Sequence, residues 1–342
     1  MRVAIDAQLA VGTATGIGEY VRGLITGLRA RGLDVSELQR PTLDPWRFDR
    51  RVFWDQILLP AAARRTRADL LHCTAGTMPF FAGIPTVVTV HDVAWFKSQA
   101  HTRYYARYYF GAFSLGLYRR ARQIVVDSEF SRSELLQFHE VPAARVRVVY
   151  PGVAEDYCRV ERHPDVEPFI LSVGTVEARK NLEVIIRALR DIPNGVRLVV
   201  AGPPTPYEDD CKKLAAEYGV EDRIVWRGYV ERNVLLDLFA RAVLLVMPSK
   251  YEGFGYGAAQ ALCAGVPLLV SNSSSLPEVV EGEAPALPCG DVQAWVTHIN
   301  AILNDRETAE RRAAAIRHGA ITRFAWTASI ARMCEVYQAA LD

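Results

Sequence analysis

The stretch from residue 242 to residue 264 constrains the fold of this chain more than any other. An apolar run at residues 242–246 (AVLLV) is followed by a glycine-rich turn and then by small residues that suit a helix. This order predicts a buried parallel strand that leads through a tight turn into a helix. Such a junction gathers free backbone N–H groups at the positive end of a helix. We therefore predict an α/β fold with a ligand-binding turn at this point.

Two polar side chains belong to this predicted unit. Glu252 falls on the turn, where its carboxylate can accept hydrogen bonds from the hydroxyl groups of a sugar. Gln260, eight residues later, falls in the first turns of the helix and can reach the same ligand. The residues between them include Gly253, Phe254 and Gly255, whose glycines let a ligand approach the backbone closely.

The motif Pro-Ser-x-Tyr-Glu-Gly-Phe-Gly at residues 248–255, with the alanine-rich segment and the Gly-Val-Pro at 265–267, resembles the donor-site signature of family 4 retaining glycosyltransferases. That signature usually has a second glutamate where this chain has Gln260, and a proline where it has Gly257. The resemblance implies a GT-B fold, in which two Rossmann-like parallel-sheet domains face each other across a cleft. Because an amide carries no charge, we expect the Gln260 replacement to alter donor affinity or donor choice.

The length of 342 residues predicts two domains, because single hydrophobic cores seldom grow beyond roughly 250–300 residues. The turn Pro151-Gly152 marks the expected hinge, and the polar, proline-containing segment 154–167 is predicted to be an interdomain linker. The resemblance assigns acceptor binding to residues 1–152 and nucleotide-sugar binding to residues 153–322. It also implies that a final helix at 323–342 crosses back to the N-terminal domain.

The charges are distributed unevenly along the chain. Residues 1–150 carry 20 Lys and Arg against 13 Asp and Glu, whereas residues 151–342 carry 20 against 26. A basic first half suits an anionic partner, such as a membrane surface or a phosphorylated acceptor, or it is simply a solvated surface. The segment 101–122 mixes tyrosines with arginines, so it is either a helix that contacts the inner membrane surface or a core helix with exposed tyrosine tips. We do not expect nucleic acid as a partner.

The compartment and the metal content follow from cysteines and carboxylates. The six cysteines are scattered without metal-binding spacing, which indicates reduced thiols and a cytoplasmic protein. This location is compatible with association of the protein with the inner membrane surface. The chain opens directly on strand-like residues, without a signal peptide or a transmembrane run. The acidic run 208–210 suits a solvated helix start. We therefore expect neither a bound metal nor a cofactor.

Three motifs of the first half are candidates for ligand contact or packing. Gly16 and Gly18 separate a strand at 2–6 from a helix at 17–31, but the long loop and the lack of a third glycine make a dinucleotide fingerprint weak. The resemblance places this loop near the donor phosphates, and a plain surface loop is the alternative. His91 follows a strand at 85–90, so it lies where open α/β sheets bind ligands. Within the amphipathic stretch 46–67, Trp54 and Asp55 are predicted to serve packing and the surface.

Two motifs of the second half suit a nucleotide sugar. The strand 169–175 contains Gly174 and leads into Arg179 and Lys180, whose cations can neutralise a leaving diphosphate. The resemblance places Tyr229 and Val230, after a strand at 224–227, near the nucleotide base.

Taken together, the resemblance implies a metal-independent hexosyltransferase of polysaccharide biosynthesis that retains anomeric configuration, with His91, Arg179, Lys180 and Glu252 as its catalytic residues. The His91-Asp92 pair favours mannose or a related deoxysugar from a GDP-sugar, with a glycan or lipid-linked saccharide as acceptor. A UDP-sugar enzyme acting on a soluble metabolite, an epimerase and a non-catalytic partner subunit are the alternatives. No carboxylate stands out as a nucleophile, so we favour a same-face route over double displacement.

Overall fold

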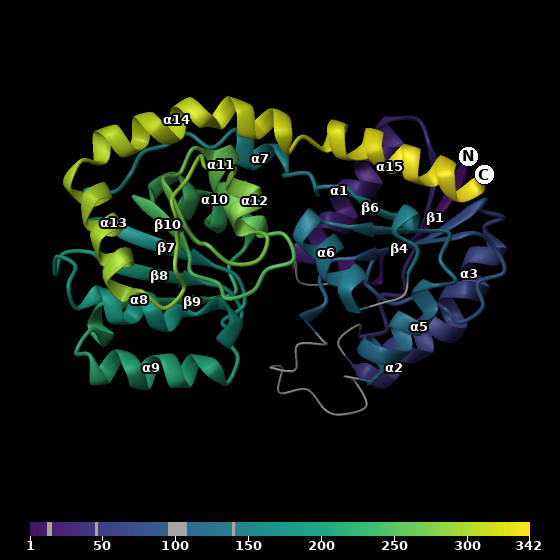
Figure 1. The fold of residues 1–342 in the computed structure, drawn as a ribbon, viewed down its shortest axis with the longest axis horizontal. Coiled ribbons are helices and arrows are strands. Elements are labelled where there is room, and N and C mark those ends of the chain that lie inside the picture. The colour runs from purple at the N-terminus through teal and green to yellow at the C-terminus, as the bar shows by residue number, and fades with distance from the viewer. Residues whose placement is uncertain (12–15, 45–46, 95–107, 139–140) are drawn as a thin grey trace. The chain divides into compact units, whose positions relative to one another are not determined.

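The computed structural model describes residues 1–11, 16–44, 47–94, 108–138 and 141–342. The chain forms two compact units, the first made of Met1–Gly152 together with Ala325–Asp342 and the second of Val153–Phe324 (Figure 1). Each unit contains a six-stranded sheet in which neighbouring strands are parallel. The predicted α/β class with two parallel sheets is therefore confirmed.

The sheet of the first unit has the strand order β2-β1-β3-β4-β5-β6. Its inner strands are buried on both faces, which explains why their sequences are mostly apolar. The edge strand β2 has a polar, half-exposed sequence, and it was not predicted for that reason. The strands are β1 (Arg2–Asp6), β2 (Asp34–Leu38), β3 (Leu70–Cys73), β4 (Thr86–Val90), β5 (Gln123–Val126) and β6 (Val146–Val148).

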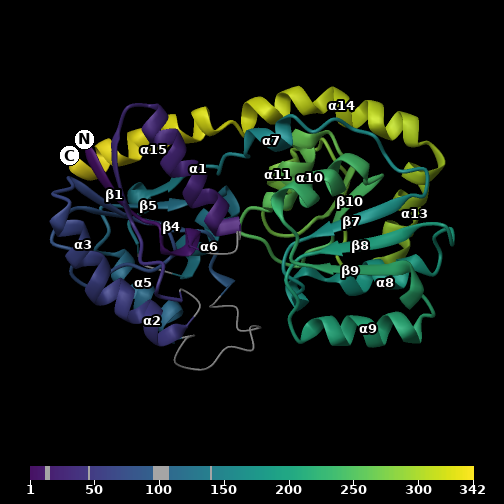
Figure 2. The same cartoon turned by 180° about the vertical axis from the view of Figure 1, so that it is seen from behind.

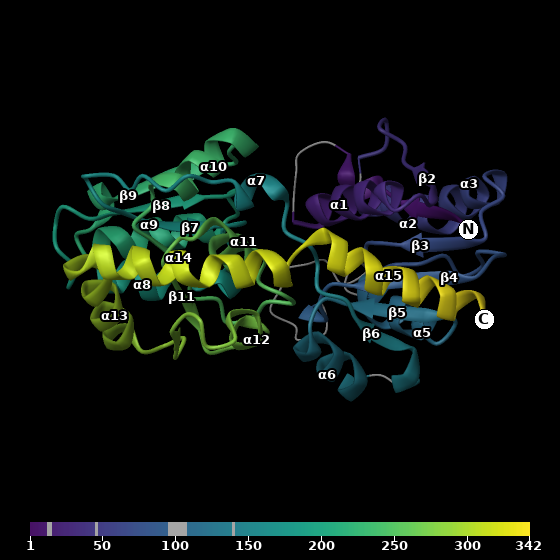
Figure 3. The same ribbon diagram turned by 90° about the horizontal axis from the view of Figure 1, so that it is seen from above.

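Helices cover both faces of this sheet. One face packs against α1 (Gly16–Ala30) and α15 (Trp326–Leu341), and Figure 3 shows α15 running along the sheet. The other face packs against α3 (Leu59–Arg65), α5 (Ser114–Tyr118) and α6 (Glu129–Phe138). The remaining short elements are η1 (Gln8–Ala10), α2 (Phe48–Phe53), η2 (Trp54–Leu58), η4 (Tyr109–Phe113) and η5 (Ala143–Arg145), of which α2 is seen beside α3 and α5 in Figure 2.

Small residues allow α1 to pack closely on α15. A Cβ atom added to Gly23 would lie 2.1 Å from the ring of Trp326, and one added to Gly27 would lie 2.5 Å from Ile330. Both distances are far below van der Waals contact, so any larger residue would push the helices apart. The two glycines therefore allow α15, which follows the second unit in sequence, to pack directly against α1.

The sheet of the second unit has the strand order β12-β11-β10-β7-β8-β9. The chain enters at β7, builds outward to β8 and β9, and then returns to the other side of β7 with β10. This reversal between β7 and β10 is a topological switch point, where ligands of open α/β sheets bind beyond the carboxyl ends of the strands. The strands are β7 (Phe169–Val173), β8 (Arg197–Ala201), β9 (Ile224–Gly228), β10 (Leu244–Met247), β11 (Leu268–Ser271) and β12 (Ala286–Leu287).

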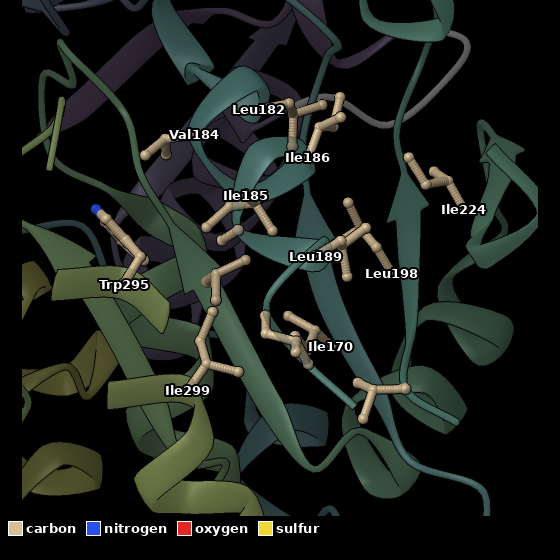
Figure 4. Close-up of a cluster of buried hydrophobic side chains, with 14 of the residues drawn as sticks. Ile170, Leu182, Val184, Ile185, Ile186, Leu189, Leu198, Ile224, Trp295 and Ile299 are labelled. Atoms are coloured by element: carbon tan, nitrogen blue, oxygen red, sulfur yellow. The ribbon is translucent and has the colours of Figure 1, made fainter. Parts of the chain in front are cut away.

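Two helical layers enclose this second sheet. One layer consists of α8 (Leu182–Leu189), α9 (Tyr207–Glu217) and α13 (Val292–Asn304), whose apolar side chains meet those of the strands in the core shown in Figure 4. Trp295 and Ile185 are fully buried there. The other layer consists of α7 (Glu155–Cys158), α10 (Arg232–Arg241), α11 (Tyr256–Ala264) and α12 (Leu276–Val280), and α14 (Arg306–Arg323) packs on α11. Short η6 (Ala178–Lys180) and η7 (Glu221–Arg223) complete the unit.

The segment 154–167, predicted to be an interdomain linker, belongs to the second unit. It contains α7, and the guanidinium of Arg162 donates to the backbone carbonyls of Phe239, Ala240 and Ala242 and forms an ion pair with Glu310. One partly buried arginine thus fastens the segment to α10 and α14. The sequence alone could not show this attachment, because the partners of Arg162 lie 77–148 residues away.

Two further local features differ from or add to the sequence prediction. The stretch 46–67 was predicted to serve packing and the surface, and Trp54 and Asp55 both fall on the packing side: both are buried, and the indole N–H of Trp54 donates to Asp6 at the end of β1 (2.9 Å). At the start of helix α6, the hydroxyl of Ser128 accepts the backbone N–H of Ser131 (3.0 Å).

The tyrosine- and arginine-rich segment 101–122 lies partly outside the described residues, which resume at 108. In the described part, Tyr109, Leu115 and Tyr118 are buried. Across the described ranges, no helix combines the length and apolar character that crossing a membrane requires.

Candidate active site

The carboxyl edge of the second sheet brings three glycine-containing strand ends close together. The backbone N–H of Gly202, after β8, donates to the carbonyl of Gly228 at the end of β9 (2.8 Å). A Cβ atom on Gly202 would lie 1.9 Å from the carbonyl oxygen of Gly174, after β7. Because that neighbour is backbone, only glycine fits at position 202. The predicted site residue Gly174 therefore lies at a sheet edge where main-chain atoms of neighbouring strands approach closely.

Arg179 and Lys180, which the sequence assigned to a diphosphate, both contact Glu252. The guanidinium of Arg179 donates to Glu252 Oε2 (3.0 Å), and the ammonium of Lys180 donates to Oε1 (2.6 Å). Arg179 also pairs with Glu177 (2.7 Å), whose side chain is more exposed. Two cations and a buried carboxylate from segments 72 residues apart thus form one cluster at the switch point.

The charge state of Glu252 follows from this cluster. Burial alone would raise the pKa of the Glu252 carboxyl, but the positive charges of Lys180 and Arg179 outweigh it and lower the pKa to about 2. The hydroxyl of Ser249 donates a further hydrogen bond to Oε1 (2.7 Å). Glu252 is therefore a carboxylate at neutral pH, able only to accept hydrogen bonds.

The backbone holds the two halves of this cluster together. The N–H of Lys250 donates to the carbonyl of Arg179 (2.7 Å), which joins the turn after β10 to η6. Asn181, in a left-handed conformation with φ 55°, donates from its amide to the carbonyls of Pro248 (3.0 Å) and Cys289 (2.9 Å). The sequence analysis did not select Asn181, although the motif ending Arg-Lys-Asn contained it.

The turn before α11 places the other predicted donor-site residues. Gly255 has φ 94° and is the N-cap of α11, and a Cβ there would lie 2.5 Å from Leu276, so the position requires glycine. Gly253 and Phe254 are buried, and the Phe254 ring packs against Phe324 with 5.8 Å between centroids. Gln260 is buried on α11. The buried Phe254 ring thus packs the turn against the rest of the second unit.

Tyr229 and Val230 follow β9, two strands from β7 at the same edge of the sheet. Tyr229 is 37% exposed and Val230 is partly buried. An exposed aromatic ring at this edge offers a stacking surface for a flat ligand.

His91 lies in the first unit, directly after β4, and both of its ring nitrogens are engaged. Nδ1 lies 2.6 Å from Asp127 Oδ2, and Nε2 lies 2.8 Å from the carbonyl oxygen of Thr74. Both partners are acceptors, so both nitrogens must donate, and that requires the protonated imidazolium. Burial would lower the pKa of His91, but the Asp127 carboxylate and the Thr74 carbonyl raise it above the ordinary value. A direct hydrogen bond from His91 to a sugar would break one of these contacts.

A buried ion cluster near the same edge was missed by the sequence analysis. Arg51 on α2 bonds to Asp6 at the end of β1 (3.0 Å) and to Asp55 (3.1 Å), and Tyr109 donates to Asp55 (2.9 Å). Burial raises the pKa of the Asp55 carboxyl to about 6, against the opposing effect of Arg51. An arginine in an amphipathic stretch usually points to solvent, so the pattern alone gave no signal for this cluster.

The remaining predicted residues are Gly16 and Gly18. Both lie in the first turn of α1, where Gly16 is exposed and Gly18 is buried, and residues 12–15 before them lie outside the described ranges. In the part of the chain that the structure describes, no group of three or more His, Cys, Asp or Glu residues could hold a metal ion.

Two parallel-sheet units, with a strand–turn–helix junction at the switch point of the second, define the GT-B class of protein. The chain belongs to the group 1, family 4 glycosyltransferases: the family model "Glycosyl transferases group 1" matches residues 154–319, and "Glycosyltransferase Family 4" matches residues 14–157. The predicted family and fold class are thus confirmed.

The individual relatives share about 30% sequence identity with this chain. The chain is 32% identical over 249 residues to O-antigen chain mannosyltransferase B of Escherichia coli, covering 67% of this chain and 65% of that protein. It is 29% identical over 237 residues to D-inositol 3-phosphate glycosyltransferase of Mycolicibacterium smegmatis, covering 65% of this chain and 54% of that protein. The match therefore spans between about half and two-thirds of these relatives' lengths.

Among solved structures, sucrose-phosphate synthase from Thermosynechococcus elongatus superposes with a TM-score of 0.80 at 21% identity, covering 99% of this chain and 98% of the other. At that identity, the likeness concerns the fold.

Proposed function

We propose that this protein transfers a hexosyl group from a nucleotide diphosphate sugar to a glycan or lipid-linked saccharide, with mannose or a related deoxysugar from a GDP-sugar as the donor. The convergence of Arg179 and Lys180 on Glu252 at the switch point carries this proposal. Two cations suit a diphosphate, and the carboxylate suits the hydroxyl groups of the attached sugar. The similarity to an O-antigen mannosyltransferase favours the mannose-type donor.

The proposed chemistry is displacement of the nucleoside diphosphate with retention at the anomeric carbon. Arg179 and Lys180 neutralise the charge that builds up on the departing phosphate, which is the largest catalytic contribution of the site. In the same-face route, a phosphate oxygen accepts the proton of the acceptor hydroxyl as that hydroxyl attacks. No step needs a metal ion, because the two side-chain cations take its place.

His91 is assigned an indirect part in this chemistry. Its ring nitrogens tie the end of β4 to Asp127 after β5 and to Thr74 after β3, so it fixes three loops at the ligand-facing edge of the first sheet.

Nucleotide titration tests the proposal. GDP, UDP, ADP, dTDP and their common sugars are titrated by calorimetry, with added Mg²⁺ and again with a chelator. We expect tight binding of one nucleotide class, unchanged by the chelator. Arg179→Ala and Lys180→Ala should each weaken that binding at least ten-fold, whereas Arg187→Ala, an exposed position on α8, should not. Failure of the folded protein to bind any nucleotide would refute the proposal and favour a non-catalytic partner subunit.

Gln260 provides a second test of the donor assignment. It is buried on α11, and the family signature has a carboxylate at this place. We expect Gln260→Glu to remain active and to bind the donor more tightly, measured as a lower KM. An inactive variant would show that the amide itself is required by this enzyme.

A UDP-sugar donor with a soluble acceptor is the second candidate. The similarity to an inositol 3-phosphate glycosyltransferase supports a phosphorylated metabolite as the acceptor. Preference for UDP over GDP in the titration would favour this candidate.

Contact with an anionic membrane fits a lipid-linked acceptor, and it is supported by one surface of the first unit. Phe53, Ile57, Phe80 and Phe81 are 48–65% exposed, and Gln56 joins their segments by accepting the backbone N–H of Phe80 (2.9 Å). Arginines border the rings: Arg64 lies 5.3 Å from the Phe81 centroid and Arg120 lies 4.2 Å from that of Phe80. Apolar side chains ringed by guanidinium groups suit anionic lipid headgroups, whereas a second copy of the same surface would be repelled.

Vesicle sedimentation tests this contact. Vesicles with anionic lipid should retain the protein at low salt and neutral vesicles should not. Phe80→Ser with Phe81→Ser should abolish retention. The matched control is Val166→Ser, because Val166 is 94% exposed on the second unit. Equal retention of both variants would refute the assignment of this surface.

A further inference from the structure

Four serines, one at the end of β11 and three in the segment that follows it, bind the turn that carries Glu252. Ser271 donates to the carbonyl of Ser249 (2.5 Å), and Ser273 donates to the carbonyl of Lys250 (2.7 Å). Ser274 accepts the N–H of Glu252 (2.9 Å), and Ser275 donates to its carbonyl (3.0 Å). We call Ser271, Ser273, Ser274 and Ser275 the serine clamp. Its hydroxyls contact residues 249, 250 and 252 of the turn through main-chain atoms alone.

The clamp controls the backbone of Glu252 on both sides. With its N–H held by Ser274 and its carbonyl held by Ser275, the residue cannot change its φ or ψ angle appreciably without losing a hydrogen bond. The carboxylate is held separately, by Ser249, Arg179 and Lys180. Backbone and side chain of Glu252 are therefore fixed by different partners, and removing a clamp serine frees the backbone from which the carboxylate projects.

Ser274 has a strained backbone conformation. It has φ 54°, in the left-handed region that side chains other than Gly, Asn and Asp rarely adopt. Its hydroxyl bridges the turn and its own loop, because it also donates to the carbonyl of Ser273 (2.7 Å). Strained residues persist where the surrounding contacts require them, and here the requirement is the hydrogen bond to Glu252.

We propose that the serine clamp is a positioning device that sets where the Glu252 carboxylate meets the donor sugar. This inference rests on the proposed function, in which Glu252 binds sugar hydroxyls and the two cations bind the diphosphate. The clamp touches neither Arg179 nor Lys180. Because it reaches the two cations only through Glu252 and Lys250, its loss should weaken recognition of the sugar more than recognition of the nucleoside diphosphate.

The test compares the affinities of the nucleotide sugar and of the plain nucleoside diphosphate by calorimetry, for wild type, Ser274→Ala and Ser275→Ala. We expect each variant to lose about ten-fold in affinity for the nucleotide sugar and in kcat, because small misplacements of a binding group are costly. Affinity for the nucleoside diphosphate should stay within two-fold. Asn272→Ala is the matched control, since Asn272 lies in the same loop with its side chain exposed.

A third variant separates the hydrogen bond from the backbone strain. Ser274→Gly removes the hydroxyl as Ser274→Ala does, but it relieves the left-handed strain. Sugar recognition should be lost in both variants. Wild-type sugar affinity in Ser274→Gly would overturn the inference, and so would an equal loss of nucleoside diphosphate affinity, which indicates general loosening of the site. A wild-type protein that binds no nucleotide sugar refutes the proposed function first, and the clamp's role with it.

Discussion

Replacing Glu252 with glutamine tests whether the two cations of the site depend on this carboxylate. Glutamine keeps the shape and can accept the hydrogen bond from Ser249, but it removes the negative charge. Arg179 then keeps Glu177 and the carbonyl of Tyr251 (3.2 Å) but loses its buried carboxylate, and Lys180 loses the carboxylate that its ammonium group contacts. We expect the second unit to become less stable at neutral pH.

The magnitude follows from the pKa of Glu252. The ordinary value is 4.5 and the folded value is about 2, and since one pKa unit equals about 1.4 kcal/mol, the charge contributes about 3 kcal/mol at pH 7. The side chain is 6% exposed, so water screens the interaction little. Because the folded pKa is depressed, the contribution is complete above pH 4.5 and is lost as the pH falls towards 2. At pH 3 about 1.4 kcal/mol remains.

The assay is chemical denaturation read by hydrogen exchange in peptides of β10 and α11, so that the second unit is followed separately. The difference between wild type and Glu252→Gln should be about 3 kcal/mol at pH 7 and should shrink to less than half at pH 3. Glu177→Gln is the matched control, because its pair with the same arginine is exposed and should contribute less than about 1 kcal/mol. A Glu252→Gln variant as stable as wild type, or a difference that does not change with pH, would refute the reasoning.

Three further predictions concern other parts of the chain. His91 should titrate above 6.5 by NMR, and its stabilising contribution should be complete below that value and lost as the pH rises through the folded pKa; a titration below 6.5 contradicts the imidazolium assignment. Gly202→Ala should destabilise the second unit by more than about 2 kcal/mol, because backbone cannot yield to the new methyl group, whereas Gly195→Ala, with open space around it, should change stability by less than about 1 kcal/mol in thermal unfolding. The hydrogen bond between the thiols of Cys158 and Cys263 lowers the pKa of Cys158 and raises that of Cys263. Mass spectrometry should therefore find that iodoacetamide alkylates Cys158 before Cys263, and the reverse order would refute this.

Much of the second unit could be predicted because its signals are local. The apolar runs that become β7 and β10 each end in a motif of charged residues and glycines, and parallel strands bring such ends to one edge. The residue types at Arg179, Lys180 and Glu252 then suggested a diphosphate and a sugar. The sequence could not show that all three meet, because their contact depends on β7 and β10 being neighbours.

The contacts that were missed join residues far apart in the sequence. The resemblance placed residues 271–279 near the donor, but nothing local indicates that the hydroxyls of the three serines 273–275 match the carbonyls and N–H groups of residues 249–252. Arg51 appeared to be one more surface arginine, because its partner Asp6 is 45 residues away on a strand. His91 was expected to face a ligand, and only the geometry shows that both ring nitrogens are engaged.

The position of α15 has a consequence for synthesis on the ribosome. In topological terms, residues 153–324 are an insertion within the first unit, and that unit is completed only by its last 18 residues. The inserted unit can finish folding while the groove formed by Gly23 and Gly27 still lacks Trp326 and Ile330. Nascent chains stalled before residue 325 should therefore carry a folded second unit beside an unfinished first one. Although it is synthesised first, the first unit is the last to be completed.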